Sequence, residues 1–300
     1  MTTPRVSVVM AVYNGGPHLA ATLDSLLAQT FTDFELIAID DGSTDGTLPI
    51  LAAYRRRDAR IRLLTQTNQG LTHALIRGCA EARAGVIARQ DCGDRSHPER
   101  LAKQLALLAG DVVLVSSAVR AVTPDGELLF VTRLDGDEAR RSLLHDDARH
   151  IKSIPHHGSA MFSRHTYVAA GGYREPFRVA QDVDLWVRMA SLGRIAVAVE
   201  ELYEATVHPT AISSVGRKQQ IEALRLIVAM RDGGDATALL AAAARLRPMR
   251  RSARREAASL YFMARCLRAR RSTTAREYLL RAIRRNPLHW RAWASLLTGK

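Results

Sequence analysis

Short apolar runs alternate with segments of helical periodicity along the first 115 residues of the chain. The apolar runs are only a few residues long and rich in β-branched side chains, which is typical of buried strands in a parallel sheet. They predict strands at residues 6–12, 35–39, 61–65, 86–88 and 112–115. Helical spacing predicts helices at residues 18–29, from the turn at 42–47 to about residue 56, at 70–84 and at 98–108. Strands that alternate with helices form βαβ units, so the sequence predicts an α/β fold with a mainly parallel sheet.

The pattern changes after residue 116. Residues 119–122 and 128–131 flank a Pro-Asp-Gly turn and predict a β-hairpin. Residues 155–175 are rich in Gly, His and aromatic side chains, as binding loops often are. Helical patterns return at residues 182–192 and 217–231, and from about residue 235 the chain is rich in Ala, Leu and Arg and is predicted to be all helix.

The charge of the chain is concentrated at one end. The net charge is +13, but residues 1–214 carry 23 Lys and Arg against 25 Asp and Glu, whereas residues 215–300 carry 20 against 5. The two parts therefore have net charges of −2 and +15. Such an asymmetry predicts two regions with different surfaces, divided near residue 214.

Three cysteines, Cys79, Cys92 and Cys266, are widely spaced and odd in number, which argues for a reducing compartment and against a disulfide framework. The first residues show no apolar signal-peptide core, and no apolar run reaches the roughly 18 residues of a membrane-spanning helix. We therefore expect a cytoplasmic protein.

Aspartates follow two of the predicted strands at the point where each strand ends. Asp40 and Asp41 follow the strand at 35–39, and Asp91 and Asp94 follow the strand at 86–88. Open α/β sheets bind ligands in the crevice beyond the carboxyl ends of their strands. Carboxylates that meet in such a crevice would suit a divalent cation and the phosphates it carries.

The motifs in this order resemble those of family 2 glycosyltransferases with a GT-A fold. The matching segments are residues 6–15, 29–36, 40–47, 68–71, 88–91, 98–101, 171–173 and 181–186. The resemblance covers roughly residues 5–210 and implies an enzyme that transfers a sugar from a nucleoside diphosphate sugar with inversion at the anomeric carbon. It also implies a divalent metal ion, Mg²⁺ or Mn²⁺, and one carboxylate that acts as the base. Residues 1–214 would be the catalytic domain.

The resemblance places the nucleotide-sugar donor against the first two strands. It implies that the backbone of Ala11 and Val12, the ring of Tyr13 and the adjacent Asn14 border the nucleobase, and that Asp41 accepts a hydrogen bond from the base. Residue chemistry alone leaves alternatives open. Tyr13 could be a core residue, and an acidic cluster near Asp41 could serve the positive end of a helix.

Asp91 and Asp94 occupy the family's DxD position, where a third aspartate usually stands at residue 93. Gly93 is a departure from that pattern. A Mg²⁺ or Mn²⁺ ion joined to a diphosphate needs only one or two protein carboxylates, because phosphate oxygens and water complete its octahedron. The resemblance therefore assigns the metal to Asp94 and Asp91, with Asp91 also near the donor. The alternative is a degenerate and inactive site.

Asp182 stands where the family has the carboxylate that deprotonates the acceptor hydroxyl. A base of this kind typically contributes about 10²–10⁴-fold to the rate. The alternative interpretation is that Asp182 caps the helix that begins there. His157 and Trp186 are expected to contact the acceptor, although His157 could be a surface residue and Trp186 a core residue.

The basic tail allows two interpretations. Arginines cluster in it at positions 250, 251, 254, 255, 265, 268, 270 and 271, interleaved with Leu260, Phe262, Met263 and Leu267. They could form a solvated face of a helical bundle, or they could attract the protein to an anionic membrane surface. Residues 275–287 resemble the second helix of a tetratricopeptide repeat, which predicts a helical hairpin. Nucleic-acid binding is not expected, because it would leave the aspartate crevice unexplained.

These observations predict a cytoplasmic enzyme, peripheral on the inner face of the membrane if the tail binds lipid. Its donor would be a nucleoside diphosphate sugar of the UDP or dTDP type. Its acceptor would be a hydroxyl of a polysaccharide or lipid-linked glycan. Two alternatives from other classes stay open: a nucleotide-sugar-binding scaffold impaired by Gly93, and a nucleotidyltransferase.

Overall fold

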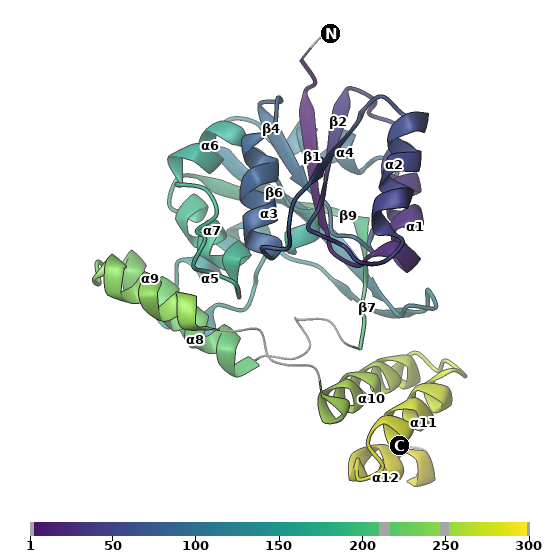
Figure 1. The fold of residues 1–300 in the computed structure, drawn as a ribbon. Coiled ribbons are helices and arrows are strands. Elements are labelled where there is room, and N and C mark those ends of the chain that lie inside the picture. Colours follow the sequence, from purple (N-terminus) through teal and green to yellow (C-terminus); the bar gives the residue numbers. More distant parts are fainter. Residues whose placement is uncertain (1–2, 210–216, 247–251, 299–300) are drawn as a thin grey trace.

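The computed structural model describes residues 3–209, 217–246 and 252–298, which form a nine-stranded sheet covered by helices (Figure 1). The strands are β1 (Val6–Val12), β2 (Phe34–Asp40), β3 (Ile61–Thr65), β4 (Val86–Arg89), β5 (Arg95–Ser96), β6 (Val112–Val122), β7 (Leu128–Thr132), β8 (Met161–Ser163) and β9 (Arg194–Thr206). They follow the order β3-β2-β1-β4-β8-β6-β9-β5, and β7 pairs with β6 outside this path.

Helices lie between the strands along the chain as far as β9 and follow one another after it (Figure 1). They are α1 (Gly16–Leu27), α2 (Thr47–Arg57), α3 (Leu71–Ala80), α4 (Arg100–Leu107), α5 (Gly136–Leu143), α6 (Arg164–Ala169), α7 (Gln181–Ala190), α8 (Arg217–Arg231), α9 (Ala236–Arg245), α10 (Ala253–Ala269), α11 (Ala275–Arg285) and α12 (Trp290–Thr298). The short 3-10 helices η1 (Ala148–His150) and η2 (His157–Ser159) lie between α5 and β8.

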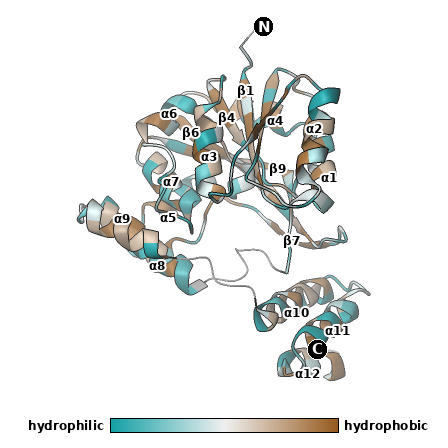
Figure 2. Cartoon of the chain, in the orientation of Figure 1, coloured by the Kyte–Doolittle hydropathy of each residue, from teal (hydrophilic) through white to brown (hydrophobic). Residues whose placement is uncertain are grey.

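The first four strands form the parallel part of the sheet, as their apolar sequences predict. β1 pairs in parallel with both β2 and β4, and β2 pairs in parallel with β3. Val8, Val9 and Ile37 are fully buried, since alternate side chains of these strands enter the cores on the two faces of the sheet. Figure 2 shows the apolar positions concentrated on these central strands.

The second half of the sheet is mixed and differs from the sequence prediction. The strand expected at 112–115 and the first hairpin strand at 119–122 are one continuous strand, β6. Ser116 and Ser117 lie between the two predicted strands, and in the structure both are buried within β6. The hydroxyls of Ser116 and Ser159 share a hydrogen bond of 2.7 Å. β8 pairs antiparallel with β4 and β6, whereas β9, which no sequence pattern indicated, runs parallel to β6.

Two apolar cores lie on opposite faces of the sheet. One is closed by α1, α2 and α4 through side chains such as Leu23, Leu51 and Leu101. The other is closed by α3, α5 and α7 and extends to α8 and α9, where Leu224, Ile227 and Ala243 are buried. α8 and α9 therefore share the core of the catalytic half.

Helices α10, α11 and α12 form a small bundle with its own core, the C-terminal bundle, which we define as residues 252–298. It packs on the β6–β7 hairpin (Figure 1), where the rings of Phe130 and Phe262 meet edge to face at 6.1 Å. The hydroxyl of Tyr278 donates to Asp125 Oδ2 at 2.6 Å. The net charge of the chain changes near residue 214, but the packing changes later, because α8 and α9 share the core of the catalytic half and the separate core begins with the C-terminal bundle. Arg250 and Arg251 lie outside the described residues, within which no helix is long and apolar enough to cross a bilayer.

Candidate active site

The carboxyl ends of β1, β2 and β4 lie side by side at one edge of the sheet. We call this edge, where open α/β sheets bind their ligands, the crevice. β1 lies between the other two strands, with Val12 beside Asp40 and Val9 beside Arg89 in the register. The N–H of Asp41 donates to the carbonyl of Val12 at 2.8 Å. Asp41 and Asp91 therefore flank the end of β1, as the strand positions predict.

Asp41 is held by the loop that follows β3. Its carboxylate accepts hydrogen bonds from Gln66 Nε2 at 2.8 Å and from the backbone N–H groups of Gln69 and Gly70, each at 2.9 Å. The residue is almost completely buried. In this structure Asp41 orders the 66–70 loop, and a nucleobase would have to share its remaining lone pairs with these donors.

Tyr13 lies on the open side of the crevice. Its side chain is 53% exposed, so it is not a core residue. Val12 is almost completely buried, and its carbonyl already accepts a hydrogen bond from the N–H of Asp41. Asn14, at φ 52°, joins the two loops: its Oδ1 accepts from Thr44 N at 2.8 Å and its N–H donates to Ser43 Oγ at 3.0 Å.

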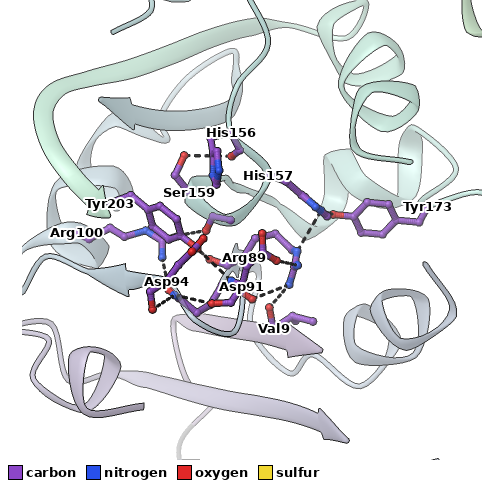
Figure 3. Close-up of polar contacts among 12 residues, drawn as sticks. Val9, Arg89, Asp91, Asp94, Arg100, His156, His157, Ser159, Tyr173 and Tyr203 are labelled. Atoms are coloured by element: carbon purple, nitrogen blue, oxygen red, sulfur yellow. Dashed lines mark hydrogen bonds and ion pairs between the residues drawn. The ribbon is translucent and has the colours of Figure 1, made fainter. Parts of the chain in front are cut away.

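Asp91 is paired with a buried arginine at the tip of β4 (Figure 3). Arg89 is fully buried, and its Nη2 donates to Asp91 Oδ1 at 2.8 Å, while its Nη1 donates to the carbonyl of Val9. Burial alone would raise the pKa of Asp91, but the charge of Arg89 is the largest opposing influence, and the pKa stays below its usual range. The side chain of Asp91 is 34% exposed, so it presents a fixed negative charge to the crevice.

Asp94 lies in a different environment from Asp91. It is buried, and its Oδ1 accepts from the N–H of Thr206 in β9 at 2.9 Å. Burial, with the charge of Asp91, raises the pKa of Asp94 to about 8, so the carboxyl holds its proton at neutral pH. The structure thus directs Asp94 toward β9, and Asp91 is the more accessible carboxylate of the DxD-like segment.

The side chains around the DxD-like segment supply only a few of the ligands that a metal ion needs. Among the described residues no three His, Cys, Asp or Glu side chains converge as a metal cage. Asp91 is accessible, and a side-chain carbon at Gly93 would lie 3.6 Å from His208 Nε2. Burial lowers the pKa of His208, which keeps that ring neutral and able to coordinate. Asp91 could hold an ion that brings its other ligands from a diphosphate, and His208 is a neutral nitrogen donor beside Gly93.

Asp182 reaches the same crevice from α7. The helix starts after Ala180, a non-glycine residue at φ 57° and ψ 30°, and Asp182 lies in its first turn. Burial raises the pKa of Asp182 to about 6, and the charge of Asp91 adds to the shift although backbone N–H groups oppose it. Two carboxylates in one crevice thus have their pKa values moved in opposite directions, which is typical of acid–base sites.

Arg89, His157 and Tyr173 form a hydrogen-bonded chain that starts at Asp91 (Figure 3). Arg89 Nε donates to His157 Nε2 at 3.3 Å, and the hydroxyl of Tyr173 lies 2.8 Å from the same nitrogen. Burial and the charge of Arg89 lower the pKa of His157 to about 3, so the ring is neutral and Nε2 accepts. His157 is therefore a part-buried link in the crevice and not a surface residue.

Trp186 lies behind His157 and is fully buried. Its Nε1 donates to the carbonyl of Pro155 at 3.3 Å, and its ring meets His157 edge to face at 6.1 Å. The direct acceptor contact expected of Trp186 does not agree with this burial, because the ring has no exposed surface. Trp186 positions His157 from the core.

The family is decided by comparison of the whole chain with known proteins. A model of the family described as "Glycosyl transferase family 2" matches residues 7–167, which is more than half of the chain. The chain belongs to this family. It is a glycosyltransferase, and the motifs at 40–47 and 88–91 fall within the matched segment.

Relatives of this glycosyltransferase are found in bacteria. EpsE of Bacillus subtilis (strain 168) is 35% identical over 205 residues, 63% of this chain and 68% of that protein. The O-antigen biosynthesis glycosyltransferase WbnJ of Escherichia coli is 30% identical over 186 residues, 61% of this chain and 71% of that protein.

Solved structures share the fold at low sequence identity. The mannosyltransferase PcManGT from Pyrobaculum calidifontis, in complex with GDP-Man and Mn²⁺, has a TM-score of 0.60 at 20% identity and covers 98% of this chain and 84% of its own. TarS 1–349 from S. aureus, in complex with UDP, has a TM-score of 0.59 at 17% identity and covers 99% and 92%. The GT-A-type sheet with C-terminal helices is therefore the fold of this family 2 enzyme, as predicted.

Arg100 is a further residue of the site, and sequence reasoning gave it no role. It is fully buried, and its guanidinium donates to the carbonyls of Arg89 at 2.6 Å and Gly158 at 3.1 Å. It also lies over the ring of Tyr203 at 4.9 Å. At Gly158 a side chain would collide with the Tyr203 hydroxyl, so the backbone approach there requires glycine. Arg100 opens α4, and no local pattern of apolar and polar positions in the sequence marks it. Arg89 does carry a signal, because it is an arginine at the end of an apolar strand, and burial there is costly unless the charge is paired.

Proposed function

We propose that this glycosyltransferase moves one sugar from a nucleoside diphosphate sugar to a hydroxyl acceptor with inversion, and that Asp182 is the base. The observation that carries the proposal is the pair Asp91 and Asp182 in one crevice, with pKa values shifted in opposite directions. A base with a pKa near 6 is ionised at neutral pH and can still accept a proton from an alcohol as the bond to the sugar forms. In-line attack requires this base to stand opposite the departing diphosphate.

The donor would lie across the end of β1. Tyr13 offers an exposed ring for stacking, and Asn14 shapes the loop beside it. The backbone of Ala11 and Val12 would border the base at the end of the strand. Asp41 would recognise the base through a lone pair left by its loop donors, which suits a ring N–H of a UDP- or dTDP-type donor. Solved neighbours contain GDP-Man, UDP or UDP-GlcNAc, which supports nucleotide-sugar binding without selecting the nucleotide.

A divalent cation, Mg²⁺ or Mn²⁺, would offset the charge that develops on the diphosphate. We assign its protein contacts to Asp91 and to His208, with Asp94 as the second carboxylate of the motif. Because Asp94 is buried and accepts a hydrogen bond from Thr206, whereas Asp91 is partly exposed, we expect Asp91→Asn to weaken Mn²⁺-dependent donor binding at least about tenfold and Asp94→Asn to weaken it much less. Equal losses in the two variants would contradict this assignment.

We propose a polysaccharide or lipid-linked glycan as the acceptor, bound beside His157. The name of WbnJ, an O-antigen biosynthesis enzyme, supports this class. The enzyme would act in the cytoplasm, peripheral on the inner face of the membrane, and no nucleic acid partner is proposed. The family assignment leaves the nucleotidyltransferase interpretation without support.

The deciding experiment is a thermal-shift screen over nucleotide sugars, with and without Mn²⁺, followed by measurement of nucleoside diphosphate release. A ligand present at about 100 times its Kd stabilises the folded state by about 2.7 kcal/mol, which gives a measurable rise in Tm. The anomeric configuration of the product, read by NMR, tests inversion. A scaffold impaired by Gly93 would show the thermal shift without release or transfer, and no shift with any nucleotide sugar would overturn the proposal.

A further inference from the structure

Helix α12 carries apolar residues on two opposite faces. One face, which includes Ala292 and Ser295, is buried in the C-terminal bundle. The other face presents Trp290, Trp293 and Leu297, at positions i, i+3 and i+7, and all three are exposed, Trp290 at 69% and Leu297 at 80%. Leu288, just before the helix, is 88% exposed. We call Leu288, Trp290, Trp293 and Leu297 the α12 face.

The surface around the α12 face is strongly basic. The C-terminal bundle contains eleven arginines and two glutamates. The guanidinium of Arg291 lies 5.3 Å from the centre of the Trp290 ring, at the edge of the α12 face. Further exposed arginines of the bundle are Arg254, Arg265, Arg270, Arg271, Arg276 and Arg284. Exposed tryptophan and leucine within a field of arginines form the composition of an amphipathic helix that lies in a membrane interface.

The apolar residues of α10 do not offer such a surface. Leu260, Met263 and Leu267, which alternate with arginines in the sequence, are buried in the core of the C-terminal bundle. Phe262 is exposed, but its ring is in contact with Phe130 of the hairpin. The apolar residues of α10 therefore cannot form a membrane contact, and the exposed apolar side chains that could do so lie on α12.

We propose that the α12 face inserts into the headgroup region of an anionic lipid bilayer, with the surrounding arginines on the lipid phosphates. Tryptophan favours this depth because its ring is apolar while its N–H stays polar. Charge selects lipid over a second copy of the chain, since two bundles of this charge repel each other. Figure 1 places the C-terminal bundle on the side of the sheet toward which β1 runs, the side of the crevice. In this arrangement, which rests on the proposed function, a lipid-linked acceptor meets the crevice near the membrane.

Vesicle binding by the full chain, without any nucleotide sugar, tests the proposal. The vesicles contain phosphatidylcholine alone or phosphatidylcholine mixed with phosphatidylglycerol, and bound protein is measured by sedimentation. We expect binding to the anionic vesicles only, falling as salt is added. Tryptophan emission should shift to the blue on binding. Because Trp186 is fully buried, this shift reports the two tryptophans of α12.

The double variant W290S/L297S should bind anionic vesicles at least about tenfold more weakly, because two side chains no longer enter the apolar layer. The matched control is L192S, since Leu192 is also exposed but lies next to α7 in the catalytic half. Circular dichroism of both variants should match the parent chain, since both substitutions are at exposed positions.

Unchanged vesicle binding by W290S/L297S would overturn the proposal, and so would equal binding to neutral vesicles. A dimer of the parent chain in sedimentation equilibrium that W290S/L297S abolishes would identify the α12 face as a self-association surface and would also overturn it. Transfer to a soluble acceptor is measured separately, so a failure of the proposed activity can be distinguished from a failure of membrane binding.

Discussion

The crevice and the C-terminal bundle are both rich in charge but arrange it in opposite ways. In the crevice each buried charge is paired at short range: Arg89 with Asp91, Arg100 with backbone carbonyls and Asp41 with three donors. In the bundle eleven arginines face two glutamates, and most of the arginines are exposed. Paired buried charge fixes the position of a functional group, whereas exposed charge of one sign produces a diffuse field.

The largest expected effect is in the crevice, where Asp182→Asn removes the base. Transfer should fall by about 10²–10⁴-fold, because the acceptor hydroxyl loses its proton acceptor. Donor binding, measured by calorimetry with a nucleoside diphosphate sugar, should change little, since the donor would contact the opposite wall. If Asp182→Asn reduced transfer and donor binding equally, Asp182 would support donor binding and would not be the base.

Arg89→Met tests whether the paired charges of the crevice also hold the fold. The guanidinium of Arg89 is fully buried and donates to Asp91, His157 and the carbonyl of Val9. Its loss should lower the free energy of unfolding by about 3 kcal/mol, measured with urea, because these partners remain buried or part-buried without a donor. The matched change in the bundle, Arg276→Met at an exposed position, should stay within about 0.5 kcal/mol. If Arg89→Met and Arg276→Met lowered the free energy of unfolding by similar amounts, the paired charge of the crevice would contribute no more to stability than the exposed charge of the bundle.

The pH dependence of transfer tests the crevice directly, because burial raises the pKa of Asp182 toward neutrality. Asp182 acts as a base in its charged form, so transfer should rise as the pH increases through about 6 and level off above it. Below that pH the rate should fall about tenfold per pH unit. A profile that is flat between pH 5 and pH 7 would contradict the base.

The same pKa makes a prediction for stability. Burial favours protonated Asp182, so its contribution is fully present below pH 3.8 and is lost as the pH rises through about 6. Asp182→Asn avoids the cost of the buried charge and should be more stable than the parent chain at pH 7, on the order of 1–3 kcal/mol, with no difference at pH 3.5. Thermal unfolding at the two pH values checks this, and a variant less stable at pH 7 would argue against it.

The two halves of the fold differ in how far the sequence predicts them. β1 and β2 are short runs of buried apolar residues, and such strands can be recognised without knowledge of their partners. The apolar ends of β6 are predicted as strands, but the serines between them and the glutamates of β9 join the sheet only through long-range pairing. Their assignment needs contacts between segments far apart in the chain, which local periodicity does not contain.

The same limit applies to the site. Strand ends predict that Asp41 and Asp91 meet beside β1, because parallel strands share one edge. The burial of Asp94 depends on Thr206, which lies 112 residues farther along the chain on β9. The pairing of Arg89 with His157 depends on the loop before β8. The positions of the carboxylates are thus readable from the sequence, but their pKa values are set by tertiary contacts.

The smallest expected effect comes from adding an unpaired charge to the crevice with Gly93→Asp. The Cβ of the new side chain would lie 3.6 Å from His208 Nε2, so its carboxylate could reach a cation held by Asp91 and His208. Gly93→Asn is the matched control, because both variants strain the backbone at φ 99° and should lose about 1–2 kcal/mol of stability. Gly93→Asp alone should bind Mn²⁺ more tightly, by about fivefold to tenfold in a calorimetric titration with nucleoside diphosphate present. Equal Mn²⁺ affinity in the two variants would mean that the ion does not lie between Asp91 and His208, and that the crevice holds its donor through hydrogen bonds.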